Sequence, residues 1–540
     1  MSNAYDAIII GGGHNGLVCG FYLAKAGRRV LILEKRDIVG GAAVTEEFHP
    51  GFRNSVASYS VSLLNPKIIR DMELERHRLK VVIRPASYFA PDQNGGHLFL
   101  TRDDKENLET IHKRSPKDAV AYAAYHERLD RLVDLFRATL LETPPNLGGG
   151  LRDLFGAGML MKRAHELGIE GQRDLLDLFG KSAGEILDNW FELDCLKGIL
   201  GFDAITGAYL SPYTPGSAYV LLHHVFGEVN GVKGAWGHAI GGMGAITQAM
   251  ASAAKEAGAE IRVNAAVKEV ILENDRAQGV VLADGTQIRA RVVASNIHPQ
   301  LLFGRLIPED ALDAEFAERM RNWRSGSGVF RMNVALSELP QFAARPAAGV
   351  ELHHKASMMI APSLDYLDTA YTDARRTGWA KKPVIEMHIP SAIDDSLAPE
   401  GKHVASLFCQ HFAPELPNGK SWNDNRDEVA DLVIDTINDY APNFKSAVIG
   451  RMALTPLDLE TKLSLVGGDI FHGQLGVDQL FSARPVLGYA GYRAPFKGLY
   501  MCGSSTHPGG GVTGLPGHNA AREILRDIGK GRAQMRAAAL

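Results

Sequence analysis

Residues 5–16 read YDAIIIGGGHNG, and the architecture of the chain follows from this short stretch. Its first half is apolar and β-branched, which predicts a strand buried in a parallel sheet. Gly11, Gly13 and Gly16 follow at GxGxxG spacing, and the residues after them have the apolar periodicity of a helix. Val30 to Leu33 predicts a second buried strand. Strand, glycine turn, helix and strand together predict the βαβ opening of a Rossmann-like unit.

Each part of this turn has a physical role in holding the pyrophosphate of a dinucleotide. Gly11 permits the tight turn, Gly13 lets the backbone approach the phosphates, and Gly16 allows the helix to pack closely on the strand. The helix begins near Asn15, and its N-terminus presents unpaired N–H groups to the anion. Glu34 ends the second strand and can accept hydrogen bonds from ribose hydroxyls. We therefore expect a dinucleotide site here.

A second glycine pair distinguishes FAD from NAD. The run that begins at Lys35 leads to Gly40 and Gly41 and then to Ala42. The doublet would bring another backbone segment against the same pyrophosphate, and a simple NAD-dependent dehydrogenase is not expected to carry it. The sequence therefore favours FAD, and we count all four residues among the candidate cofactor-binding residues.

The middle of the chain contains a further glycine-rich block. Gly241 to Gly244 precedes a helical pattern over Ile246 to Ala257 and a strand over Glu260 to Val263. Val267 then starts a series of alternating segments that ends at Ser295, which predicts a small β-meander returning to the main sheet. Val267 is a further candidate cofactor-binding residue.

Residues 499–514 read LYMCGSSTHPGGGVTG, a short strand followed by a Gly/Pro-rich loop that opens a helix. This loop also matches GxGxxG, but no acidic strand end follows about 20 residues later, so a second Rossmann unit is not favoured. We interpret the loop as a nest of backbone N–H groups directed at the flavin, with a plain flexible loop as the alternative. The candidate cofactor residues here are Gly503, Gly511, Val512 and Thr513.

These motifs carry a resemblance to a known family. The run from Gly11 through Glu34 to Gly41 resembles the N-terminal signature of FAD enzymes of the phytoene desaturase and amine oxidase superfamily. Residues 499–514 resemble the C-terminal flavin motif of bacterial-type phytoene desaturases, and residues 241–296 are also similar to this family. Within it, the chain is most similar to the branch of pyridine nucleotide-disulphide oxidoreductase domain-containing protein 2. The resemblance covers about half of the chain.

The resemblance implies hydride transfer from a hydrophobic, isoprenoid- or lipid-like substrate to flavin N5. It also implies non-covalent FAD, because no cysteine stands in the flavin-tethering context of amine oxidases. Two alternatives remain, an amine oxidase-like enzyme and a flavin-binding regulatory protein with little turnover. The sequence identifies no catalytic residue. His238 and His507 are candidates for proton carriers near the flavin, and a satisfied structural histidine is the alternative for each.

The motifs predict an α/β protein of two lobes, consistent with a chain too long for one core. A Rossmann-like FAD-binding lobe is assembled from three segments, and a mixed α+β substrate lobe is formed by two insertions. The FAD-binding segments are residues 1–80, 236–304 and 491–540, and the insertions are residues 81–235 and 305–490.

Composition excludes several classes of function. Lys and Arg number 58 against 62 Asp and Glu, with no long block of either sign, so nucleic-acid binding is not expected. The four cysteines form no CxxC pair, so we expect no metal site, and a reducing compartment is the simpler interpretation. No apolar run reaches 18 residues, and residues 1–6 show no targeting leader. The expected location is cytoplasmic in a bacterium and mitochondrial in a eukaryote.

Two segments of the first insertion are amphipathic, Leu151 to Leu167 and Ala183 to Leu200. In the first, Arg152, Lys162 and Arg163 accompany Leu, Phe and Met side chains, a mixture compatible with an interfacial helix. Because phytoene desaturases work on lipids, the resemblance implies peripheral membrane contact. The alternative is a helix that covers the substrate cavity or an interface of a homo-oligomer.

Overall fold

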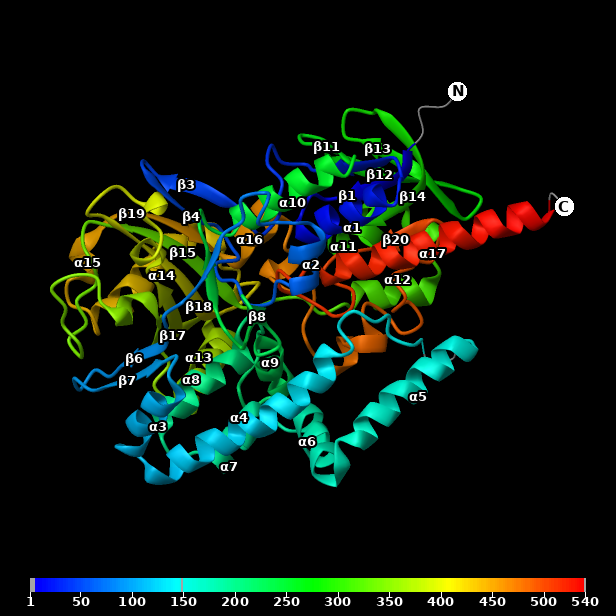
Figure 1. The fold of residues 1–540 in the computed structure, drawn as a ribbon. Helices are drawn as coiled ribbons and strands as arrows, with labels where there is room; N and C mark the ends of the chain where they lie inside the picture. The colour runs from blue at the N-terminus through cyan, green and yellow to red at the C-terminus, as the bar shows by residue number, and fades with distance from the viewer. Residues whose placement is uncertain (1–4, 147–148, 539–540) are drawn as a thin grey trace.

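The computed structural model describes residues 5–146 and 149–538 and contains two large sheets of seven strands each (Figure 1). Residues 1–4, part of the segment in which no targeting leader is expected, lie outside the described residues. The first sheet has the order β11-β2-β1-β14-β13-β12, and β20 pairs with β14. Its strands are β1 (Tyr5–Ile10), β2 (Val30–Leu33), β11 (Glu260–Arg262), β12 (Val267–Glu273), β13 (Arg276–Leu282), β14 (Gln287–Ser295) and β20 (Leu499–Met501).

The predicted βαβ opening lies at the centre of this sheet. β1 pairs in parallel with β2 on one side and with β14 on the other. Successive residues of β1 enter different apolar clusters, since Ala7 and Ile9 pack on one face of the sheet while Ile8 and Ile10 pack on the other. Burial on both faces explains the continuous apolar run. The predicted meander is also present, because β12, β13 and β14 are antiparallel neighbours.

Three helices cover one face of this sheet, and all three follow glycine-rich segments. They are α1 (His14–Lys25), α10 (Gly244–Glu256) and α17 (Leu515–Ala538), and α1 packs against the other two. The helix α17 continues past Gly529 into the C-terminal tail, for which the sequence predicted no structure.

The second sheet has the order β19-β15-β18-β17-β16-β6-β7 and combines strands from both insertions. Its strands are β6 (Ala86–Pro91), β7 (His97–Thr101), β15 (Val329–Leu336), β16 (Ser357–Ile360), β17 (Trp379–His388), β18 (His403–Phe412) and β19 (Val448–Leu454). The helices α13 (Leu364–Thr377) and α14 (Trp422–Asn438) pack on it. The chain is therefore an α/β protein, as predicted.

The first insertion also contributes a set of helices that lie in the lower half of the molecule in Figure 1. They are α3 (Asp104–His112), α4 (Pro116–Arg137), α5 (Leu151–Glu166), α6 (Gly168–Gly180), α7 (Ala183–Trp190), α8 (Asp194–Ile205) and α9 (Ser217–His224). The shorter elements are α2 (Pro66–Asp71), α11 (Pro299–Leu301), α12 (Ala314–Arg321), α15 (Phe444–Ala447), α16 (Pro456–Leu463), β3 (Thr45–His49), β4 (Phe52–Ser55), β5 (Val81–Ile83), β8 (Glu228–Val229), β9 (Val232–Lys233) and β10 (Gly237–Ala239).

Both amphipathic segments of the first insertion are helical. The segment expected over Ala183 to Leu200 is two helices, because the buried Asp118 carboxylate accepts the backbone N–H groups of Glu192 and Leu193 at 3.0 and 2.7 Å and ends α7 there. The other segment is the single helix α5, but none of its residues is buried. None of its residues lines the cavity of the candidate site described below. Among the described residues, no helix has the length and apolar character needed to cross a bilayer.

Candidate functional site

The glycine turn between β1 and α1 is as tight as the GxGxxG spacing predicts. Gly11 has a φ of +95°, a conformation that other residues rarely adopt. A Cβ atom on Gly16 would lie 2.2 Å from the carbonyl oxygen of Gly11. The helix therefore packs on the strand at a distance that only glycine allows.

Glu34 ties this turn to the end of β2. One carboxylate oxygen accepts the backbone N–H of Gly12 at 2.8 Å, and the other accepts the N–H of Arg36 at 2.9 Å. Each carboxylate oxygen has two lone pairs, so both retain capacity for a ligand. Glu34 lines the large cavity described below, where this capacity is available to ribose hydroxyls.

The second glycine pair lies against the same turn. The N–H of Gly40 donates to the carbonyl of Gly12 at 2.9 Å, and a Cβ atom on Gly41 would lie 3.4 Å from the Cα atom of Gly13. Gly40 has a φ of +135° and Gly41 a φ of +58°. The structure thus brings both glycine motifs to one place, although they are separated by a helix and a strand.

A cavity of about 400 Å³ opens at the carboxyl ends of the central strands. This volume lies in the range of small-molecule and cofactor sites, which in α/β sheets are found at this edge. Ten of the predicted cofactor residues line the cavity, namely Gly11, Gly13, Glu34, Lys35, Gly40, Gly41, Ala42, Val267, Gly511 and Val512.

Four other predicted residues are not part of the cavity wall. Asn15 donates to the Ser504 hydroxyl at 3.2 Å, and the Thr513 hydroxyl accepts the N–H of Leu515 at the start of α17. A Cβ atom on Gly503 would lie 2.6 Å from the Asn296 carbonyl. Together with Gly16, which is the fourth, these residues support the segments that form the cavity wall.

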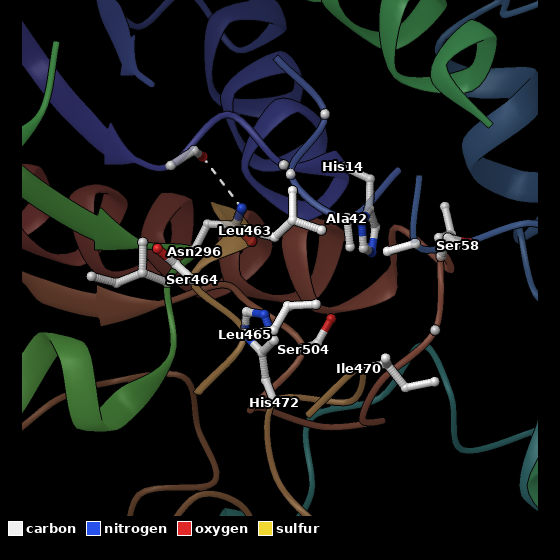
Figure 2. A pocket seen from close by; sticks show the side chains of 18 of the residues that line it. His14, Ala42, Ser58, Asn296, Leu463, Ser464, Leu465, Ile470, His472 and Ser504 are labelled. Carbon is white, nitrogen blue, oxygen red and sulfur yellow. Dashed lines mark hydrogen bonds between the residues drawn. The ribbon is translucent and has the colours of Figure 1, made fainter. Parts of the chain in front are cut away.

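Several residues of the cavity wall were missed by sequence reasoning. Asn296 follows β14 and donates to the Gly11 carbonyl at 3.3 Å, and the rule that ligands bind beyond the carboxyl ends of parallel strands could have identified it. His14 and His472 belong to a glycine turn and an irregular loop, and their sequence context gives no comparable signal. The residues that the sequence had not singled out for this site include His14, Ser58, Asn296, Ser464, His472 and Ser504 (Figure 2).

The two histidines predicted as proton carriers lie elsewhere. His238 contacts the Asp394 carboxylate through Nε2 at 3.0 Å, and His507 contacts the Thr139 carbonyl at 3.2 Å. Both are buried, and neither lines the cavity. This placement favours the structural alternative for both histidines.

The end of the cavity beside the second sheet is aromatic and backed by buried charge. Tyr59 and Phe408 line it with ring centroids 5.4 Å apart. Tyr59 donates its hydroxyl to Glu386, and the guanidinium of Arg331 lies 4.5 Å from its ring centroid. Glu386 in turn contacts His388 Nε2 at 2.9 Å.

Burial and neighbouring charge set the protonation of this cluster. Burial alone would raise the pKa of Glu386, but His388, Tyr59 and Arg84 outweigh it and lower the pKa to about 2. Burial and Arg84 lower the pKa of His388 to about 4. At neutral pH the cluster therefore holds one carboxylate and an uncharged imidazole against the guanidinium groups of Arg84 and Arg331. Its net charge is positive.

A family model described as flavin-containing amine oxidoreductase matches residues 16–330, more than half of the chain. The chain belongs to the flavin-containing amine oxidoreductase family. A curated relative, the pyridine nucleotide-disulfide oxidoreductase domain-containing protein 2 of Rattus norvegicus, is 42% identical over 97% of this chain and 94% of its own length. The predicted superfamily membership is confirmed, and so is the similarity to this branch.

More distant relatives cover the same length. A limonene dehydrogenase subunit of Castellaniella defragrans is 28% identical over 97% of this chain and 95% of its own length. Among solved structures, an oxidoreductase of Methanosarcina mazei has a TM-score of 0.60 at 16% identity, with 96% of this chain and 99% of that chain covered. The similarity to this solved structure supports the fold described above. The protein is an oxidoreductase of this flavin family, and its cofactor is FAD.

The residues of the cavity fit this cofactor. Any side chain on Gly13 would crowd Asn296, because a Cβ atom there would lie 2.8 Å from its Nδ2. Polar atoms buried at the same place have no hydrogen-bond partner in the protein, among them His14 Nε2 and His472 Nδ1. Gly11, Gly13, Glu34, Gly40 and Gly41 would hold the dinucleotide portion.

Proposed function

We propose that this oxidoreductase is a dehydrogenase or desaturase that removes hydride from an uncharged, isoprenoid- or lipid-like substrate. The observation that carries the proposal is the continuity of one cavity. It extends from Glu34, beside the dinucleotide turn, to the aromatic end at Tyr59 and Phe408. FAD, when bound, supplies the hydride acceptor.

The wall of the aromatic end supports an apolar substrate. Hydrophobic side chains from both lobes line the cavity that leads to it, including Ala57, Val61, Leu63, Phe408, Leu463, Ile470 and Phe471. Such a surface binds an alkene chain by burying apolar area and excludes water from the reacting carbons. The name of the relative from Castellaniella, a limonene dehydrogenase subunit, supports the same substrate class.

The buried charge behind Tyr59 disfavours a protonated amine. Arg84 and Arg331 outnumber the single carboxylate of Glu386, and neither guanidinium can lose its charge. Burial raises the pKa of the nearby Asp203 to about 8, so this carboxyl is mostly uncharged at neutral pH. An ammonium group would therefore meet an excess of positive charge in a medium of low dielectric. An uncharged substrate meets no such penalty.

Anaerobic mixing of the FAD-loaded protein with candidate substrates tests the proposal. We expect an apolar alkene, with limonene and a carotenoid as probes, to bleach the absorption of the bound flavin, and a diamine such as putrescine to leave it unchanged. Reduction by the amine alone would contradict the proposal, and so would the absence of reduction by any compound of a wider panel of alkenes, retinoids and alcohols.

A pair of variants localises the reaction to the cavity. Ile470→Asp places a charge in the apolar wall and should abolish reduction by the alkene while FAD remains bound. Val477→Asp is the matched control, because Val477 is half exposed and lies outside the cavity. Equal rates in the two variants would refute the assignment of the aromatic end to the substrate.

A further inference from the structure

A loop of the second insertion, residues 469–473, reaches the cofactor cavity in an unusual conformation. The buried Asp469 carboxylate accepts the backbone N–H groups of Gly326, Phe471 and Gly473 at 2.9, 2.7 and 3.1 Å. Within this frame His472 adopts a φ of +56°, in the left-handed region that non-glycine residues rarely occupy. Such conformations persist where the surrounding structure imposes them, and they concentrate at functional sites.

The ring of His472 faces the cavity together with that of His14. Both side chains belong to the cavity wall, and Figure 2 shows both rings beside it. His14 is the first residue of α1, directly after Gly13 of the dinucleotide turn. Two loops that are far apart in the sequence therefore present one imidazole each to the same space.

Both rings have a buried nitrogen without a partner. His14 Nε2 and His472 Nδ1 make no hydrogen bond within the protein. An unpaired buried polar atom is costly, so native structures seldom contain one that no ligand or water satisfies. Burial lowers the pKa of each imidazole to about 4, so both rings are uncharged at neutral pH, and an uncharged imidazole has one donor nitrogen and one acceptor nitrogen.

The position of the two rings favours the cofactor as their partner. The carbonyl of Gly511, in the loop before α17, lies beside the His14 ring. The same loop packs on the histidine loop, since a Cβ atom on Gly510 would lie 2.6 Å from the Cα atom of Phe471. The dinucleotide turn, the loop before α17 and the loop of residues 469–473 thus meet at one point in the cavity.

We propose that His14 and His472 contact the bound FAD and hydrogen-bond its polar atoms, and that Asp469 is the positioning residue for His472. This inference rests on the FAD that the proposed function requires, but not on the substrate. His472 would thus be a cofactor-contacting residue supplied by the second insertion, outside the segments that carry the recognised FAD motifs.

Substitutions at His472 separate the polar contact from the backbone conformation. His472→Asn keeps a polar atom at the position of Nδ1 and tolerates a positive φ, whereas His472→Leu lacks the polar atom. We expect His472→Leu to weaken FAD binding about tenfold, the effect of one lost hydrogen bond, and His472→Asn to restore most of the affinity. His14→Leu should lower the affinity to a similar extent.

The measurements are the dissociation constant for FAD and the absorption spectrum and midpoint potential of the bound flavin, none of which needs a substrate. His353→Leu is the matched control, because the His353 ring is fully buried and neither of its nitrogens makes a hydrogen bond, but it lies outside the cavity. We expect the spectrum and the potential to change in His472→Leu and to stay at the native values in His353→Leu.

Two results would overturn this inference. The first is that His472→Leu and His14→Leu bind FAD with the affinity, absorption spectrum and midpoint potential of the native protein. The second is that His353→Leu changes the spectrum and potential of the flavin as much as His472→Leu does. That result would show that the loss of any buried imidazole disturbs the flavin through packing. Failure of every substrate to reduce the flavin would refute the proposed function and leave this inference intact, whereas a protein that takes up no FAD would refute both.

Discussion

Replacement of Gly16 by alanine tests the close packing of α1 on β1. The added Cβ atom would lie 2.2 Å from the Gly11 carbonyl oxygen, about 1 Å inside ordinary contact. Both atoms are fixed to the backbone, so no side-chain rotation can relieve the overlap. The start of α1 must therefore withdraw from the strand, and the glycine turn moves with it.

The expected magnitude follows from this geometry. Overpacking in a rigid environment costs about 1–3 kcal/mol, and the higher helix propensity of alanine returns about 1 kcal/mol at most. Because the overlap lies in the cofactor turn, we expect a loss of FAD affinity of about tenfold to a hundredfold. Titration of the apoprotein with FAD, followed by quenching of flavin fluorescence, measures this loss.

Gly20→Ala is the matched control on the same helix. Its Cβ atom would lie 2.5 Å from Cδ1 of Ile32, the end of a flexible side chain that can move aside. This variant should lose some thermal stability and keep the native affinity for FAD. If Gly16→Ala binds FAD as tightly as Gly20→Ala does, the interpretation of the turn is wrong.

Three further predictions concern the turn, the buried histidines and the exposed helix. Gly13→Val should abolish FAD binding, because a branched side chain would occupy the path of the pyrophosphate; stoichiometric flavin in that variant would contradict the assignment. Burial lowers the pKa of His411 to about 3, so below its ordinary value of 6.5 the unfolded chain binds a proton that the folded chain does not. The contribution of His411 to the free energy of unfolding is therefore fully present above about pH 6.5, and it falls on acidification by on the order of 1.4 kcal/mol per pH unit. Urea unfolding as a function of pH should show a shallower fall of this free energy in His411→Leu. An unchanged pH dependence in that variant would argue against a neutral His411. Helix α5 exposes Leu151, Leu154 and Phe155 by 86, 69 and 72%, so we expect flotation with anionic liposomes at low salt and its loss in Phe155→Glu; a protein that stays in the soluble fraction would favour an interface between protomers instead.

The FAD lobe could be predicted because its signals are local. A glycine turn, a buried strand and a terminal acid occupy fewer than 40 residues, and each has its own physical reason. The extent of α1 and the order of strand and helix around it needed no knowledge of the rest of the chain. The same holds for the meander between Val267 and Ser295, whose alternation and turns are local as well.

The arrangement of the substrate end could not be predicted because its residues are brought together only by the tertiary fold. Tyr59 and Glu386 are 327 residues apart in the sequence, and Arg331 comes from a third segment. His472 faces the cavity because Asp469 holds a left-handed turn, a conformation that no periodic pattern reveals. Conversely, His507 stands in a recognisable motif and yet contacts the Thr139 carbonyl outside the cavity.

The flavin content of the purified protein tests the central claim most directly. The account predicts one FAD per chain, released intact by heat or acid, because the cavity combines the glycine turn with Glu34 and no cysteine is among the described residues that line it. Absorption of the native protein and of the released supernatant measures both the amount and the mode of binding. A protein that stays colourless after incubation with excess FAD would contradict the account, and flavin that remains with the precipitated protein would contradict its non-covalent attachment.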